Sequence, residues 1–221
     1  MSVVVELKIG KMRAKRRPSS NIFIARGKTG RGDYFKALLG LMGEHGLPFY
    51  KSARRGRAQG PEGLIAVDDV VIVKVDSQWD ERGGTNMDLV KAIVEAVLAH
   101  PDGFAGEVVV ADNGQAQYGA HGHGGSLDYE RNNAEDTGQS IQEVVNDLSD
   151  AHKVSTYLWD RITTRAVGEY SEGDTEDGYI VEEVESPLTG IRVSYPKFTT
   201  EHGTHISFKK GVWNQKSRVY N

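Results

Sequence analysis

Runs of β-branched residues alternate with amphipathic helical segments through the middle of the chain. Val70–Val75 and Glu107–Ala111 are valine-rich and bounded by polar residues, a pattern that predicts two buried strands. Between them, apolar residues recur at helical spacing after the candidate N-cap Thr85, until His100 and Pro101 end the helix. A strand, a helix and a strand of these lengths predict a right-handed βαβ unit with parallel strands.

The same alternation extends to both sides of this unit. Asn21–Arg26 is predicted as a strand and Asp33–Glu44 as a helix with one apolar face. After a long loop, Asp112–Asp136, the capping box Ser140–Glu143 predicts the start of another helix, and Val154–Trp159 is predicted as the strand that follows it. Three strands are therefore expected to share one sheet.

The pattern changes towards the end of the chain. Tyr179–Val184, Gly190–Tyr195 and His205–Phe208 are short alternating segments joined by turns, which predict antiparallel strands. The predicted fold class is α/β, with a mainly parallel sheet, flanking helices in βαβ units and a short antiparallel C-terminal extension. We predict a basic tail over residues 1–20 and a single α/β domain over residues 21–221.

Composition narrows the classes of protein and of site. The 221 residues are 38% hydrophobic and 26% charged, as is typical of a folded globular chain. Cysteine is absent, which excludes a disulfide framework, a zinc–thiolate site and an iron–sulfur cluster within these residues. No apolar run reaches the length of a membrane helix, so we expect a cytoplasmic protein without a membrane partner.

Charge is distributed unevenly along the chain. Residues 1–60 contain 14 Lys and Arg against 3 Asp and Glu, whereas the rest contains 13 against 28. The basic residues cluster in Lys8–Arg17, Arg26–Arg31 and Arg54–Arg57. A basic arm can bind phosphate backbones, but no nucleic-acid motif accompanies the charge. A solvated extension with basic loops is the favoured interpretation, and a nucleic-acid-binding module is the alternative.

Six ordered segments resemble those of a known family: Asp68–Lys74, Gly84–Val90, His100–Phe104, Val108–Gln115, Val193–Phe198 and Ile206–Lys209. In this order they resemble the domain-of-unknown-function family 362, over residues 21–221. The family typically has Asn where Asp76 stands, and it continues beyond the strand after Tyr220. The resemblance therefore implies the N-terminal part of a longer domain, incomplete at its C-terminus. It implies no activity, because the activity of the family is unknown, and the cysteines of the iron–sulfur segments in some relatives are absent here.

Polar residues gather where two predicted parallel strands end, the place where open α/β sheets bind ligands. Carboxylates and amides there are ligand types for Mg²⁺ or Mn²⁺, and Asp76 and Asp112 are the candidate metal ligands. Two close carboxylates repel unless a cation, a lysine or a proton lies between them. The alternative role for such residues is to cap turns. The remaining ligand-binding candidates are Gln78, Trp79, Asp80, Asn113 and Gln115, with Thr85 and Asn86 at the helix start as a candidate anion site.

Histidine pairs give weaker candidates. His121 and His123 could ligate a transition metal, but without a third ligand in the pattern an exposed glycine-rich loop is the favoured interpretation. His202 and His205 are three residues apart and point to opposite faces of a strand, unless a turn intervenes at Gly203.

Two further patterns concern acidic residues and lysines. Glu172–Glu183 is superficially similar to a calcium-binding loop, but the sixth position holds Asp177 instead of glycine, so the match fails. Lys74 and Lys197 are candidate catalytic lysines by residue type alone.

The sequence favours a ligand-binding or enzyme-like α/β domain for a small polar or anionic substrate, with a divalent cation as a candidate cofactor. Whether the chain is an enzyme, and in which oligomeric state it works, remain open at this point. The alternative is nucleic-acid binding through the basic first 60 residues.

Overall fold

The computed structural model describes residues 3–6, 21–26, 33–77, 84–113, 127, 134, 138–159 and 165–221. The chain forms two compact units, each built from two stretches of sequence. The first comprises Met1–Asp69 and Asp88–Gly106, and the second comprises Val70–Met87 and Glu107–Asn221. Within the described ranges, no helix combines the length and the apolar character needed to cross a membrane.

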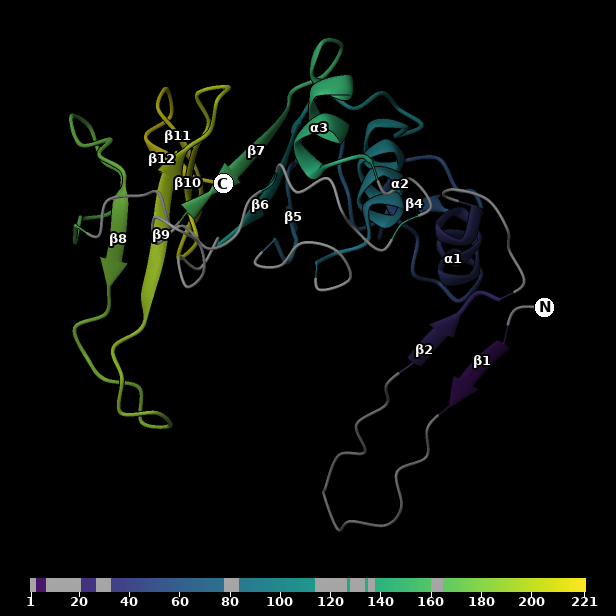
Figure 1. Cartoon of the computed structure of the whole chain (residues 1–221), viewed down its shortest axis with the longest axis horizontal. Coiled ribbons are helices and arrows are strands. Elements are labelled where there is room, and N and C mark those ends of the chain that lie inside the picture. The colour runs from purple at the N-terminus through teal and green to yellow at the C-terminus, as the bar shows by residue number, and fades with distance from the viewer. Residues whose placement is uncertain are drawn as a thin grey trace. The chain divides into compact units, whose positions relative to one another are not determined.

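Short elements make up the described part of the first unit (Figure 1). In chain order they are β1 (Val3–Glu6), β2 (Asn21–Ile24), α1 (Asp33–Glu44), β3 (Tyr50–Lys51), β4 (Gln59–Gly60) and α2 (Met87–Leu98), whose residues from Asp88 onward belong here. β1 pairs antiparallel with β2, and β3 pairs parallel with β4. A strand thus lies within residues 1–20, which the sequence pattern predicted as a tail.

Aromatic rings link α1 to the loop segments of the first unit. Phe35 meets Phe49 edge-on at 6.2 Å, Phe49 meets Tyr50 at 5.0 Å, and Tyr50 meets His100 at 5.2 Å between ring centroids. His100 is 4% exposed, and its Nε2 lies 3.1 Å from the carbonyl oxygen of Ile65. The helix-ending histidine of the sequence analysis is therefore a core residue whose ring is hydrogen-bonded.

The second unit begins with a three-stranded parallel sheet. β5 (Val70–Lys74), β6 (Glu107–Asp112) and β7 (Val154–Leu158) lie side by side in that order, with Val70 opposite Glu107 and Val108 opposite Val154. The predictions that the first two strands are parallel neighbours and that the third shares their sheet are confirmed. α3 (Ile141–Ser149) precedes β7 and begins with the predicted capping box of Ser140 and Glu143.

A larger antiparallel sheet follows in the same unit. Its order is β12-β11-β10-β9-β8, so each strand pairs with its neighbours in the chain. The α/β class is confirmed, but the prediction of a mainly parallel sheet is wrong, because this described antiparallel sheet has five strands and the described parallel sheet of β5, β6 and β7 has three. The strands are β8 (Gly178–Val181), β9 (Ser194–Thr199), β10 (His205–Ser207), β11 (Gly211–Asn214) and β12 (Val219–Tyr220).

Pro196 explains why the sequence pattern misplaced β9. A proline inside a run argues against a central strand, and the pattern predicted a strand over Gly190–Tyr195 that stops short of it. In the structure the carbonyl oxygen of Pro196 accepts a hydrogen bond from the N–H of Phe208, just past the end of β10. This bond continues the β9–β10 register and lies at the end of the ladder, so the missing N–H of Pro196 removes only a terminal hydrogen bond and costs the sheet little.

Side-chain alternation sets the layers of the second unit. Val109 and Ala111 of β6 form a buried cluster with Phe198 of β9 and Ile206 of β10. The opposite face of the parallel sheet bears α3, since the hydroxyl of Thr156 on β7 donates to Gln142 at 2.7 Å. The parallel sheet is thus covered by the antiparallel sheet on one face and by α3 on the other.

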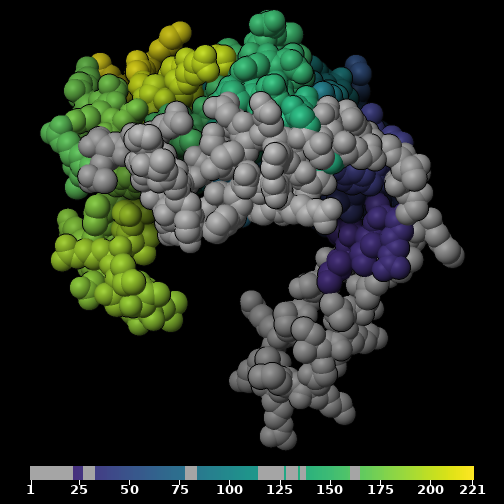
Figure 2. Space-filling view, in the orientation of Figure 1, coloured from purple at the N-terminus to yellow at the C-terminus, as the bar shows by residue number. Residues whose placement is uncertain are grey.

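The loop between β8 and β9 extends from the antiparallel sheet and exposes apolar side chains. Val184, Leu188 and Ile191 are 78%, 93% and 67% exposed. Figure 2 shows this loop as a yellow-green lobe that extends away from its sheet. The loop therefore extends beyond the sheet and does not lie across its strands.

Phe198→Ala should destabilise the protein by about 3–5 kcal/mol, because Phe198 is fully buried between the two sheets. The measurement is the free energy of unfolding from urea denaturation. Phe208→Ala is the matched control: Phe208 meets Phe198 at 5.9 Å but is 39% exposed, so it should cost clearly less. Equal losses for the two variants would contradict the layer arrangement.

Candidate functional site

The carboxyl ends of the three parallel strands meet at one edge of the sheet. β5 ends at Lys74, β6 at Asp112 and β7 at Leu158, and Asp112 lies directly opposite Leu158. Trp159 follows β7, and its ring centroid lies 6.0 Å from Lys74 Nζ. The sheet therefore brings together an ammonium, a carboxylate and an aromatic ring from three separate strands.

Asp112 is the centre of this cluster. It is 3% exposed, and its Oδ1 accepts a hydrogen bond from Lys74 Nζ. Its Oδ2 accepts from the backbone N–H of Ser77 at 3.0 Å and from the Ser77 hydroxyl at 2.8 Å. The N–H of Asn113 also donates to the carboxylate. A buried charge with this many donors is compensated, which explains why it can lie at the end of an interior strand.

Opposing effects act on the titration of this carboxylate. Burial raises the pKa of Asp112, whereas hydrogen bonds from Lys74, Ser77 and Asn113 lower it. The bonds prevail, and the pKa of Asp112 lies below its ordinary value. Asp112 is therefore ionised at neutral pH and holds Lys74 by charge as well as by geometry.

The other predicted site residues have different roles. Asp76 is exposed, and its backbone N–H donates to the hydroxyl of Thr85 at 2.8 Å while its carbonyl accepts from the Thr85 N–H at 3.0 Å. Thr85 thus closes the loop after β5, and α2 begins two residues later. Asn86 is half-buried at that helix start. Ser77, the residue after Asp76, donates to Asp112, and a metal site shared by Asp76 and Asp112 stays a prediction. The calls on Gln78, Trp79, Asp80, Gln115, His121 and His123 lie outside the described residues.

Lys74 binds Asp112, the carboxylate that the sequence analysis named as a candidate metal ligand. The ammonium of Lys74 forms an ion pair with Asp112 and neutralises its charge. Among the residues that the structure describes, no group of three or more His, Cys, Asp or Glu side chains could hold a metal ion. Asp76 and Asp112 therefore have no third ligand of these types within that part of the chain.

A second polar cluster lies on the outer face of the antiparallel sheet. Asp177 accepts a hydrogen bond from the Thr199 hydroxyl at 2.9 Å, and the same hydroxyl oxygen lies 2.8 Å from His205 Nδ1. A hydroxyl has one hydrogen and a carboxylate only accepts, so Nδ1 of His205 must donate to Thr199. Nε2 is then an acceptor, and it contacts the amide nitrogen of Gln215.

Tyr170 and Lys197 support this cluster. Lys197 is fully buried, donates to the carbonyl of Gly168 at 2.9 Å, and lies 4.1 Å from the Tyr170 ring centroid. The Tyr170 ring is 5.0 Å from that of His205. Burial and the nearby charge of Asp177 raise the pKa of Tyr170, and the same two causes raise the pKa of Tyr157 to about 12. Lys197 therefore anchors the segment before β8 to β9.

Sequence reasoning missed this cluster, although its signal was present. Thr199 and His205 are register partners on adjacent strands, so their side chains share a face. The pattern considered His205 only together with His202, which is exposed and lies in the turn at Gly203, where φ is +79°. Asp177 entered only as the residue that breaks a calcium-loop pattern. Correct strand bounds would have been needed to connect these residues.

The basic residues of the first unit are partly neutralised. Arg57 forms an ion pair with Glu44 at 2.7 Å, while Arg54 and Arg55 are exposed. Nucleic-acid binding through this region stays the alternative interpretation, and no observation tests it.

No family model, curated protein or solved structure matches this chain.

Asp112→Asn should lower the free energy of unfolding at neutral pH by about 1–3 kcal/mol, because it removes the charge that Lys74 and Ser77 bind. The folded-state pKa of Asp112 is depressed, so its contribution is present above the unfolded pKa of about 3.9 and is lost as the pH falls through the folded pKa. The gap between parent and variant should therefore narrow below about pH 4.

The measurement is urea denaturation across a pH series. Asp147→Asn, an exposed change on α3, is the control and should alter stability little at any pH. A gap that stays constant down to the acid limit would contradict the role of the Asp112 charge.

Proposed function

We propose that the second unit is an enzyme-like domain that binds a small polar or anionic ligand at the carboxyl edge of β5, β6 and β7. The observation that supports this most directly is the Lys74 ammonium, held at that edge by the buried Asp112. Open α/β sheets bind their ligands outside the carboxyl ends of the parallel strands. The cluster thus lies where this fold class places its ligands.

Lys74 has the chemistry that such a ligand needs. An ammonium has three N–H groups, and within the described residues two of them have the acceptors Asp112 Oδ1 and the carbonyl of Val75. The Lys74 side chain is 55% exposed, so a ligand can approach the third. Because Asp112 fixes the ammonium, a ligand oxygen meets a donor that loses little entropy on binding. Carboxylate and phosphate oxygens are the acceptors that gain most from a charged donor.

A divalent cation is the second candidate for this edge. Mg²⁺ or Mn²⁺ would need the carboxylate oxygens of Asp112, and these already accept from Lys74 and Ser77. A cation would have to displace the ammonium, so it competes with the protein's own charge. Removal of the Lys74 charge should therefore weaken the binding of an anionic ligand but favour the binding of a divalent cation.

The proposed membership of family 362 is compatible with this site. Two of the segments that carry the resemblance, Asp68–Lys74 and Val108–Gln115, supply Lys74 and Asp112. These segments form β5 and β6 and the residues at the carboxyl end of β6. The resemblance adds no activity, so the reaction must come from experiment.

Inorganic phosphate should shift the amide resonance of Ser77 in a saturable way, with a dissociation constant in the millimolar range. Lys74→Gln should weaken this binding roughly tenfold or more, since a hydrogen bond to a charged group contributes about 1.5–3 kcal/mol. The measurement is a titration followed by ¹⁵N–¹H correlation NMR. Lys209→Gln is the control, because Lys209 is an ion-paired surface lysine of the antiparallel sheet.

Equal phosphate affinity in the parent and in Lys74→Gln would contradict the proposal. A parallel titration with MgCl₂ tests the cation candidate. We expect Mg²⁺ to shift the Ser77 amide in Lys74→Gln more strongly than in the parent, because the ammonium no longer competes. Tight Mg²⁺ binding to the parent, with no response to phosphate, would instead establish a cation site.

A further inference from the structure

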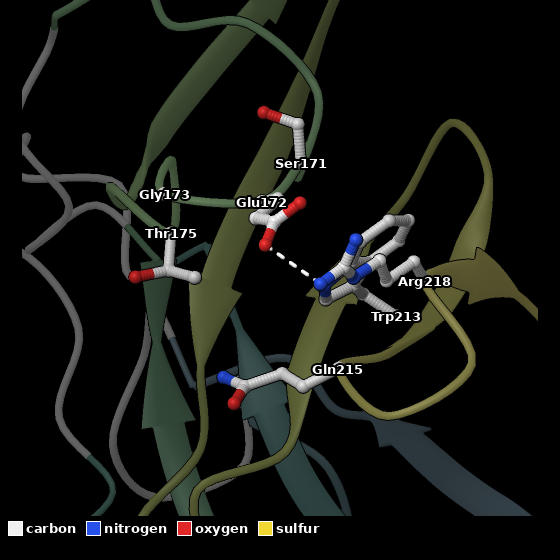
Figure 3. A pocket seen from close by; sticks show the side chains of 7 residues that line it. All are labelled: Ser171, Glu172, Gly173, Thr175, Trp213, Gln215 and Arg218. Atoms are coloured by element: carbon white, nitrogen blue, oxygen red, sulfur yellow. Dashed lines mark ion pairs between the residues drawn. The ribbon is translucent and has the colours of Figure 1, made fainter.

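A pocket lies beside the second polar cluster, on the antiparallel sheet and away from the Lys74 edge. Its volume is about 330 Å³, at the small end of the range for ligand sites. One wall is the turn that contains Ser171 and Thr175, and the other is formed by Trp213 and the β11–β12 hairpin (Figure 3). Backbone hydrogen bonds between Ser171 and Asp174, at 3.1 and 3.2 Å, fix the turn.

The lining of the pocket is polar but electrically balanced. Glu172 and Arg218 form an ion pair at 2.7 Å across it, so their formal charges cancel (Figure 3). The other functional groups are the hydroxyls of Ser171 and Thr175 and the amide of Gln215. These groups both donate and accept hydrogen bonds, and no uncompensated charge among the lining residues favours an ionic ligand.

Trp213 supplies the apolar surface of the pocket. Its ring packs against Tyr220 with centroids 5.1 Å apart and planes at 62°, so its orientation is set by the sheet. The face of an indole ring is electron-rich and attracts weakly positive C–H groups. A fixed aromatic face beside a mutually neutralised ion pair and uncharged donors and acceptors suits a molecule with C–H groups on one side and hydroxyls at its rim.

Gln215 is positioned by the hydrogen-bonded chain described above. Its amide nitrogen contacts His205 Nε2, and His205 Nδ1 is bound through Thr199 to Asp177. Each group in this chain donates to the next, ending at a carboxylate, so the order of donors is determined. Gln215 is itself exposed at the hairpin, and without this chain its amide would rotate freely. This series of hydrogen bonds thus preorganises the Gln215 amide, which lines one side of the pocket, before any ligand binds.

We propose that this pocket binds a neutral, hydroxyl-rich molecule of about monosaccharide size. The ligand packs its C–H face on Trp213 and exchanges hydrogen bonds with Gln215 and with polar groups of the facing turn. His205 and Thr199 act as positioning residues for Gln215. The site is independent of the Lys74 edge, and neither site requires the other.

Titration with glucose, N-acetylglucosamine and myo-inositol tests this proposal. At least one should shift the indole N–H of Trp213 and the side-chain amide of Gln215, saturating at millimolar concentration. Gln215→Leu should weaken binding roughly fivefold or more, because one prepared hydrogen-bonding wall is lost. Lys216→Leu, the neighbouring exposed position outside the pocket lining, should leave binding unchanged. Lys74→Gln should also leave it unchanged.

Thr199 provides the test of positioning. Thr199→Val should weaken binding and change the ¹⁵N shifts of the His205 ring, whereas Thr199→Ser should restore both, since it returns the hydroxyl. The proposal is overturned if none of the three probes shifts Trp213 at millimolar concentration, or if Gln215→Leu binds them as the parent does. It is also overturned if inorganic phosphate, and no neutral probe, shifts the Trp213 indole.

Discussion

The contact between Phe198 and the apolar face of β6 determines on which face of the antiparallel sheet the polar side chains of β9 and β10 lie. Phe198 points towards Val109 and Ala111, so its neighbours Lys197 and Thr199 must point to the other face of β9. The same alternation turns His205 outward, because Ile206 is directed into the core. One buried aromatic residue thus separates an apolar interior from a polar outer surface, and a shift of one residue in register would exchange them.

Two different physical arrangements keep charges inside this unit. At the sheet edge, Asp112 is ionised and compensated by Lys74 and by the backbone of Ser77. On the outer face, Lys197 is fully buried beneath Tyr170, where its ammonium meets the carbonyl of Gly168, the ring face and, at 3.7 Å, a carboxylate oxygen of Asp174. The first arrangement leaves the ammonium of Lys74 exposed to a ligand. The second buries the ammonium of Lys197, where no ligand can reach it. Residue type alone could not distinguish these two lysines.

The sequence predicted the parallel part of the fold well because that part depends on local signals. Valine runs, a helix between the strands and the Ser140 capping box are all visible in short windows. The antiparallel sheet was underestimated, because the predicted strand ended at Tyr195, before Pro196, and β12 has only two residues. Strand order predicted that Asp112 lies at the carboxyl edge of the sheet, whereas a site that it shares with Asp76 stays a prediction. The contact between Ser77 and Asp112 depends on how the chain turns after β5, and the periodicity of apolar residues does not encode that turn.

The order of the parallel strands also has a consequence for how the chain is made. β5, β6 and β7 leave the ribosome in the order in which they lie in the sheet, so each can pair with a strand that is already present. The valine and alanine face of β6 must nevertheless wait for Phe198 and Ile206, which are synthesised much later. During that interval the nascent chain presents an uncovered apolar sheet face, the kind of surface that chaperones bind. The late strands thus complete both the core and the protection of this protein from aggregation.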